Sequence, residues 1–89
     1  MRADQKREAV FNALESRGLK AVLLCGYDDA IIGLLDTDVG GASICYDTAK
    51  ILKALVKTGM NYDEAVEFFE FNIEGAKFSD GNPTFIDTL

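Results

Sequence analysis

The stretch LKAVLLCGYDDAIIGLLDTDVGGASICY, residues 19–46, decides the fold. It holds three short aliphatic runs, at 19–25, 30–35 and 42–46, which are separated by turns rich in Gly and Asp. Three consecutive apolar runs with short connections predict strands that form an antiparallel meander. Gly33 interrupts the middle run, and a glycine inside a strand indicates a bulge or a close backbone approach.

Helices are predicted on both sides of this stretch. Before it, apolar residues at helical spacing predict a helix over 4–17 that ends at Gly18. After it, Asp47 is expected to cap a helix at 48–58. Asn61 and Glu64 have the spacing of a capping box, so they begin a further helix that ends at Gly75.

A last short strand is expected at 84–87, at an edge of the sheet because Pro83 precedes it. The predicted order is therefore α-β-β-β-α-α-β. This order defines an α+β fold, in which a three-strand meander and a C-terminal strand form a small antiparallel sheet packed with three helices.

The length and composition limit the class of protein. The chain has 89 residues, which predicts a single domain over 1–89. Its longest apolar runs are far shorter than the roughly 20 residues needed to span a bilayer. Five of the first eight residues are charged, and this segment contains no apolar signal region. We therefore expect a cytoplasmic protein without a membrane partner.

No catalytic set is recognisable. The chain has no His, which removes the commonest general base and metal ligand. Cys25 and Cys45 both lie in predicted strands, so both are expected to be buried core thiols. Asp36 and Asp38, like the pair at 28–29, are interpreted as turn formers. The sequence therefore favours a non-enzymatic protein with no metal and no cofactor.

Charge is distributed unevenly along the chain. The formal net charge is -6, but residues 1–60 carry eight basic and eight acidic side chains. The whole excess lies in residues 61–89, which argues against a direct nucleic-acid partner. Much of it forms an acidic stripe at +4, +3 and +4 spacing on the last predicted helix: Asp63, Glu67, Glu70 and Glu74.

Two interpretations of the acidic stripe remain open. It either pairs with the lysines of the preceding helix (Lys50, Lys53 and Lys57) or coats a solvated face, or it binds a partner with a basic surface. Phe68 and Phe71 lie off the inward face of the same helix. They need another cover, either within the chain or from a second copy, and a homo-oligomer is therefore expected.

The segment from 26 to 86 resembles a group of small acidic phage and prophage proteins of uncharacterised function. The resemblance rests on Gly26-Tyr27-Asp28-Asp29-Ala30-Ile31-Ile32-Gly33, Tyr46-Asp47, Gly59-Met60, Glu64-Ala65, Phe71-Asn72, Gly75-Ala76 and Pro83-Thr84-Phe85. It implies life in the cytoplasm of a bacterial host and a regulatory or host-directed binding role. It assigns no catalytic residue, and the chain departs from the pattern at Asn82-Pro83-Thr84, where Thr-Pro is expected.

Two functions follow as hypotheses. The first is non-catalytic, regulatory or inhibitory binding to a host or phage protein through the acidic helix, with Phe68 and Phe71 in the contact. The alternative is a small-molecule or nucleotide-binding module with a polar site near the 26–29 turn, formed by Asp28, Asp29 and Asn72.

Overall fold

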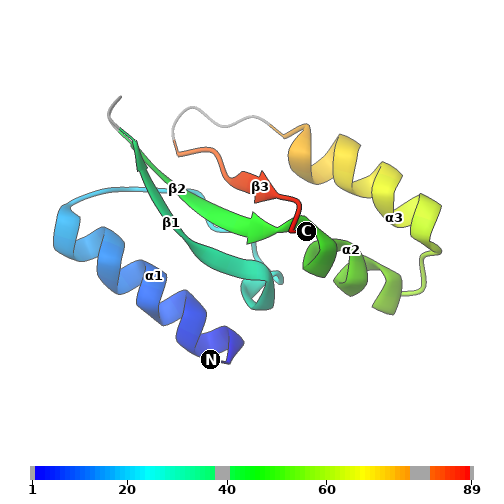
Figure 1. The fold of residues 1–89 in the computed structure, drawn as a ribbon, viewed down its shortest axis with the longest axis horizontal. Coiled ribbons are helices and arrows are strands. Elements are labelled where there is room, and N and C mark those ends of the chain that lie inside the picture. The colour runs from blue at the N-terminus through cyan, green and yellow to red at the C-terminus, as the bar shows by residue number, and fades with distance from the viewer. Residues whose placement is uncertain (1, 38–40, 77–80, 89) are drawn as a thin grey trace.

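The computed structural model describes residues 2–37, 41–76 and 81–88. Three helices and a small sheet build it (Figure 1). In chain order the elements are α1 (Ala3–Arg17), the 3₁₀ turn η1 (Asp28–Ala30), β1 (Ile31–Thr37), β2 (Gly41–Asp47), α2 (Thr48–Lys57), α3 (Tyr62–Phe68), the π-helical η2 (Phe69–Glu74) and β3 (Thr84–Ile86). The predicted α+β class and the order of helices around a small sheet are confirmed.

The sheet has the order β1-β2-β3 and is mixed rather than wholly antiparallel. β1 and β2 form the predicted antiparallel hairpin, and its register shifts between Ile31 and Gly33. The interruption at Gly33 therefore marks a bulge, as its position in the strand indicated. β3 lies at the predicted edge but runs parallel to β2, because two helices return the chain to the same end of the sheet.

Residues 19–25 differ from the predicted strand, since they contain no regular secondary structure. Their backbone finds single partners instead of a ladder: the Val22 N–H donates to the Gly81 carbonyl at 3.0 Å, and the Leu24 N–H donates to the Tyr46 hydroxyl at 2.9 Å. Apolar side chains of the segment, including Leu19 and Leu23, still pack against the core. The aliphatic run therefore indicates contact with the core, which a strand and a covering loop share.

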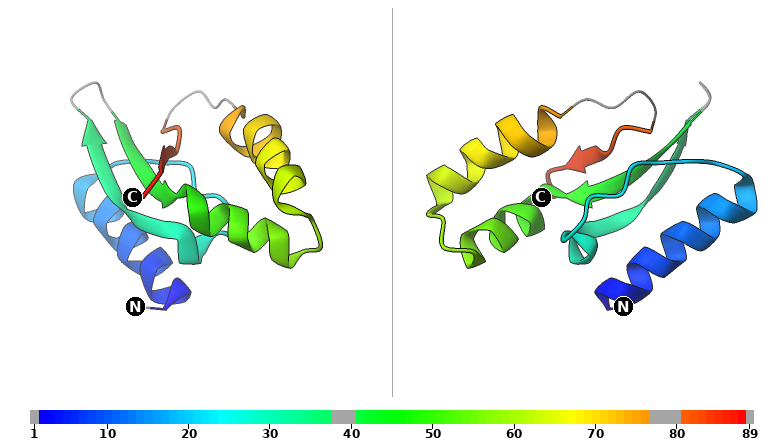
Figure 2. Two further views of the ribbon diagram at one scale, coloured as in Figure 1. Left: turned by 45° about the vertical axis from the view of Figure 1, so that its right-hand side comes forward. Right: turned by 180° about the vertical axis from the view of Figure 1, so that it is seen from behind.

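The core is centred on β2, whose residues 42–46 are all buried. Figure 2 shows α1 and α3 at opposite ends of the molecule with the sheet between them. α1 contributes Val10 and Leu14 to the core, and α2 contributes Ile51 and Leu55. At the β3 side, the Phe85 and Phe69 rings form a T-shaped pair with 5.1 Å between centroids, which holds η2 against the sheet.

The predicted helix ends are confirmed where hydrogen bonds define them. Gly18 has φ 65° and ends α1 in a Schellman motif, in which the Leu19 N–H donates to the Leu14 carbonyl at 2.9 Å. The Asp47 side chain accepts from the Ala49 N–H at the start of α2. The π-helical continuation of α3 was not predicted, since the sequence pattern of 61–74 is that of one α-helix.

The two cysteines occupy different environments, so the prediction that both are buried is confirmed for one and wrong for the other. Cys45 is buried in β2, but Cys25 is exposed because its segment is a loop at the surface. Asp38 of the second acidic turn lies outside the described residues. None of the described helices is long and apolar enough to cross a membrane.

Candidate functional site

The outer side of α3 and η2 is the most distinctive surface of the molecule. The inner side of this helical segment buries Ala65, Phe69 and Ile73 in the core. Helical spacing therefore directs the residues on the opposite side of the segment to solvent. Phe71 is 73% exposed and Phe68 is 36% exposed, so the structure leaves two large aromatic side chains at a surface.

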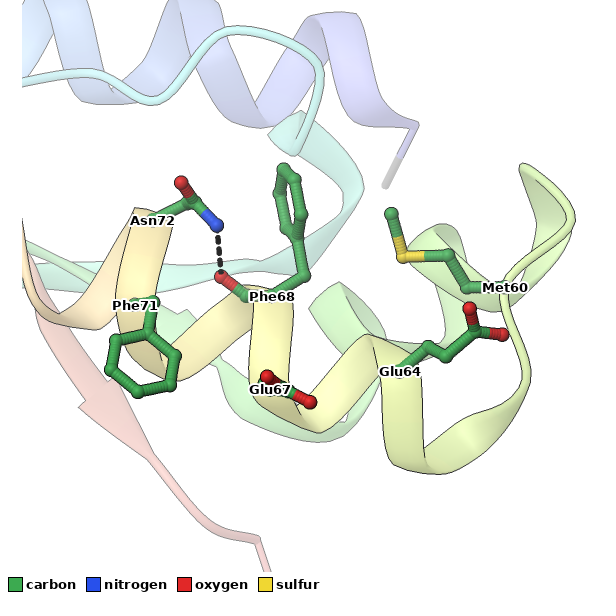
Figure 3. Close-up of a pocket in the computed structure, with 6 residues that line it drawn as sticks. All are labelled: Met60, Glu64, Glu67, Phe68, Phe71 and Asn72. Carbon is green, nitrogen blue, oxygen red and sulfur yellow. Dashed lines mark hydrogen bonds between the residues drawn. The ribbon is translucent and has the colours of Figure 1, made fainter.

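These side chains line an open hollow of about 330 Å³, which we name the aromatic hollow (Figure 3). Its walls are Met60, Glu64, Glu67, Phe68, Phe71 and Asn72. The Met60 side chain reaches from the α2–α3 connection toward the Phe68 ring, while Glu67 lies along the helix between Glu64 and Phe71 (Figure 3). The hollow thus combines apolar walls with two carboxylates.

Local hydrogen bonds hold the helix that carries the aromatic hollow. Asn61 Oδ1 accepts from the Glu64 N–H at 2.8 Å, and Glu64 Oε1 accepts from the Asn61 N–H at 3.0 Å. This capping box fixes the first turn of α3 and orients Glu64. Asn72 Nδ2 donates to the Phe68 carbonyl at 3.2 Å, within the segment where the helix widens from α to π geometry. Single π turns in helices are frequent at functional sites.

The structure divides the residues that were predicted to bind a partner. Glu67, Phe68 and Phe71 line the aromatic hollow together with Asn72. The other acidic residues of the stripe are exposed on the same helical segment but do not line it: Asp63, Glu70 and Glu74. Met60 and Glu64 also line the aromatic hollow and were not predicted from the sequence. Glu64 precedes Glu67 and Phe68 by three and four residues, and that spacing places all three on one side of a helix.

The acidic stripe does not pair with the lysines of α2. In the described part of the chain, no ion pair joins Asp63, Glu67, Glu70 or Glu74 to Lys50, Lys53 or Lys57. Pairing of the stripe with the α2 lysines is therefore not seen among the described residues. The four carboxylates of the acidic stripe are left to solvent or to another molecule.

Asp28 and Asp29 connect the turn before β1 to α1. Asp28 Oδ2 lies 3.9 Å from Arg7 Nη1, and Asp29 Oδ1 lies 3.8 Å from Lys6 Nζ. Lys6 Nζ also donates to the Asp29 carbonyl at 2.7 Å. Asn72 lines the aromatic hollow, which neither aspartate lines, so the proposed constellation of Asp28, Asp29 and Asn72 is divided between two places.

Over residues 2–37, 41–76 and 81–88, no group of three or more carboxylates or thiols is arranged to hold a metal ion.

Comparison with known proteins gives no relative: no family model matches the chain, and neither curated proteins nor solved structures match it. A function for this chain is therefore inferred from the geometry and chemistry of its surface.

Proposed function

We propose that the protein acts by non-catalytic binding of another protein, through the aromatic hollow and the carboxylates beside it. The occupant is a segment with an apolar side chain flanked by Lys or Arg. The observation that carries the proposal is Phe71, a large aromatic side chain that is 73% exposed and stands beside Glu67 in the aromatic hollow.

The apolar walls supply the binding energy in this proposal. Phe and Met are enriched at the cores of protein–protein interfaces, where burial of their apolar surface favours association. Met60, Phe68 and Phe71 offer three such side chains around one depression. An apolar side chain of the partner fits there and removes them from water.

The carboxylates supply selectivity and rate. Glu64 and Glu67 line the aromatic hollow, and three further acids on α3 and η2 lie near it without an ion pair in the described residues. A negative field of this kind attracts basic partners and disfavours acidic ones. The resemblance to phage and prophage proteins adds a host or phage protein as the source of the basic segment and the bacterial cytoplasm as the setting.

The test uses purified protein as bait in a bacterial lysate, followed by binding measurements with the captured protein in pure form. We expect Phe71→Ala to weaken the purified complex by about tenfold or more, because it removes the central aromatic contact. Glu67→Gln should weaken it by about two- to fivefold at low salt and have a smaller effect at high salt.

Matched controls separate this face from the rest of the surface. Phe11→Ala removes another exposed aromatic, and Glu15→Gln removes one exposed acid on α1. Both should leave the affinity unchanged. Equal effects of the Phe11 and Phe71 variants, or binding that is independent of salt, would overturn the proposal. A bait that light scattering shows to be a dimer, and that Phe71→Ala converts to a monomer, would assign the surface to a second copy instead.

A further inference from the structure

A second hollow, of about 200 Å³, lies between α2 and the turn that precedes β1, and we name it the lysine hollow. α2 packs against η1 here, so two segments that are distant in sequence form its walls. The walls are Gly26, Tyr27, Asp29, Ala30, Lys50, Lys53, Ala54 and Lys57. It shares no residue with the aromatic hollow.

Three lysine residues are among the walls of the lysine hollow. Lys50, Lys53 and Lys57 follow one another at +3 and +4, which places them on one side of α2. None of them has an ion pair in the part of the chain that the structure describes, whereas Lys6 and each of Arg2, Arg7 and Arg17 has a carboxylate partner. The molecule thus leaves these three cations without an internal counter-charge although its net charge is -6.

The single carboxylate in the wall does not neutralise them. Asp29 Oδ1 is 3.8 Å from Lys6 Nζ, and the same ammonium donates to the Asp29 carbonyl at 2.7 Å. Lys6 therefore offsets the charge of Asp29. Like charges one helical turn apart repel each other, so an anion that bridges them relieves a cost that the free protein bears.

We propose that the lysine hollow binds a phosphate group, either free or carried by a small molecule. An ammonium group offers three hydrogen-bond donors and no acceptor, and lysine is a common ligand of phosphate. The volume lies below the roughly 300–1,000 Å³ of pockets for drug-sized ligands, which limits the organic part of the ligand to a short one. The concave shape favours a compact anion over an extended acidic chain.

The test is a titration of the full chain with inorganic phosphate and, separately, with glycerol phosphate at constant ionic strength. Amide chemical shifts measure binding at each step. Saturable shifts are expected around residues 26–30 and 50–57. Lys53→Gln and Lys57→Gln should each weaken binding by about two- to fivefold, and the double variant by about tenfold or more. Binding of glycerol phosphate alone would identify a phosphorylated molecule as the ligand, and equal binding of both would identify the phosphate group.

Lys20→Gln is the matched control, because Lys20 is exposed and lies outside the lysine hollow. It should leave the titration unchanged, and each variant should keep the wild-type melting temperature without phosphate. The proposal is overturned by shifts that fail to saturate, by shifts that sodium chloride reproduces, or by an equal loss in Lys20→Gln. Because the two hollows share no residue, this titration and the Phe71 test fail independently.

Discussion

At the scale of single residues, the two cysteines differ in accessibility although the sequence presents them alike. Cys25 is exposed, whereas burial in β2 raises the pKa of the Cys45 thiol. The thiolate is the nucleophile that attacks a thiol reagent, so both burial and the raised pKa slow the reaction at Cys45. We expect one thiol to react quickly with a disulfide reagent and the second at least about tenfold more slowly, at a rate set by opening of the fold.

Mass spectrometry of the labelled chain assigns the fast site. In denaturant the two thiols should react at similar rates, which controls for intrinsic reactivity. Similar rates in the native protein would contradict the exposure of Cys25 or the burial of Cys45.

The difference between the cysteines also shows that the local sequence does not decide whether a single residue is buried. Both lie among aliphatic neighbours, and this pattern correctly predicted burial for Cys45. Cys25 stands at the end of a run that covers the core without joining the sheet, so its side chain is free to face water. Local composition cannot distinguish these cases, because burial depends on which long-range partner the backbone finds.

At the scale of elements, the capping box at Asn61 is predicted to hold α3. Asn61→Ala removes the acceptor for the Glu64 N–H, and loss of such a cap costs about 1 kcal/mol. For a domain of this size, that corresponds to a fall in melting temperature of about 4–8 °C. Thermal unfolding followed by circular dichroism measures the change.

Glu64→Gln is the matched control for the cap, since Gln also completes a capping box at this position. It should unfold close to the wild-type temperature. A melting temperature that does not change in Asn61→Ala would show that α3 does not depend on the box.

The elements that could be predicted from the sequence are those whose local signals and long-range roles agree. A Gly- and Asp-rich turn signal in the sequence precedes β2, and a cap residue begins both α2 and α3; each signal agrees with the place of its element in the fold. Residues 19–25 and η2 carry no such signal. A loop across the core and a π turn are both set by packing, the latter where Phe69 and Ile73 enter the core.

At the scale of the whole molecule, the acids and the lysines of one helix pair border different hollows. The acids of α3 and η2 and the lysines of α2 are adjacent in sequence, and pairing between them was an open alternative. Neither set has an ion pair in the described residues, and each borders its own hollow. The acidic stripe was predictable from helical spacing, but the lysine hollow was not, because its other wall comes from residues 26–30, far from α2 in the sequence.

Tyr46 connects the core to the covering loop, and the stability of the whole molecule should depend on its ionisation. The side chain is fully buried, packs on Phe85, and accepts the Leu24 N–H at 2.9 Å. Burial raises the pKa of Tyr46 above its ordinary value of about 10, and the nearby Asp28 and Cys25 act in the same direction, while the Leu24 hydrogen bond lowers it.

The sign of the pH dependence follows from this raised pKa. Above about pH 10 the unfolded chain loses the tyrosine proton while the folded chain keeps it, so the free energy of unfolding falls as pH rises. Below that pH the contribution of Tyr46 is fully present. The Cys45 thiol acts in the same direction, because its pKa is also raised by burial.

Tyr46→Phe isolates the tyrosine in this alkaline loss of stability. At neutral pH the variant should lose about 1 kcal/mol, because the Leu24 N–H loses its partner. From about pH 10 upward it should lose stability less steeply than wild type, since it has no phenol to ionise. Urea unfolding at a series of pH values measures both effects, and comparison at each pH cancels the contribution of Cys45. Parallel curves for the two proteins would mean that ionisation of the buried phenol does not contribute to the loss of stability at high pH.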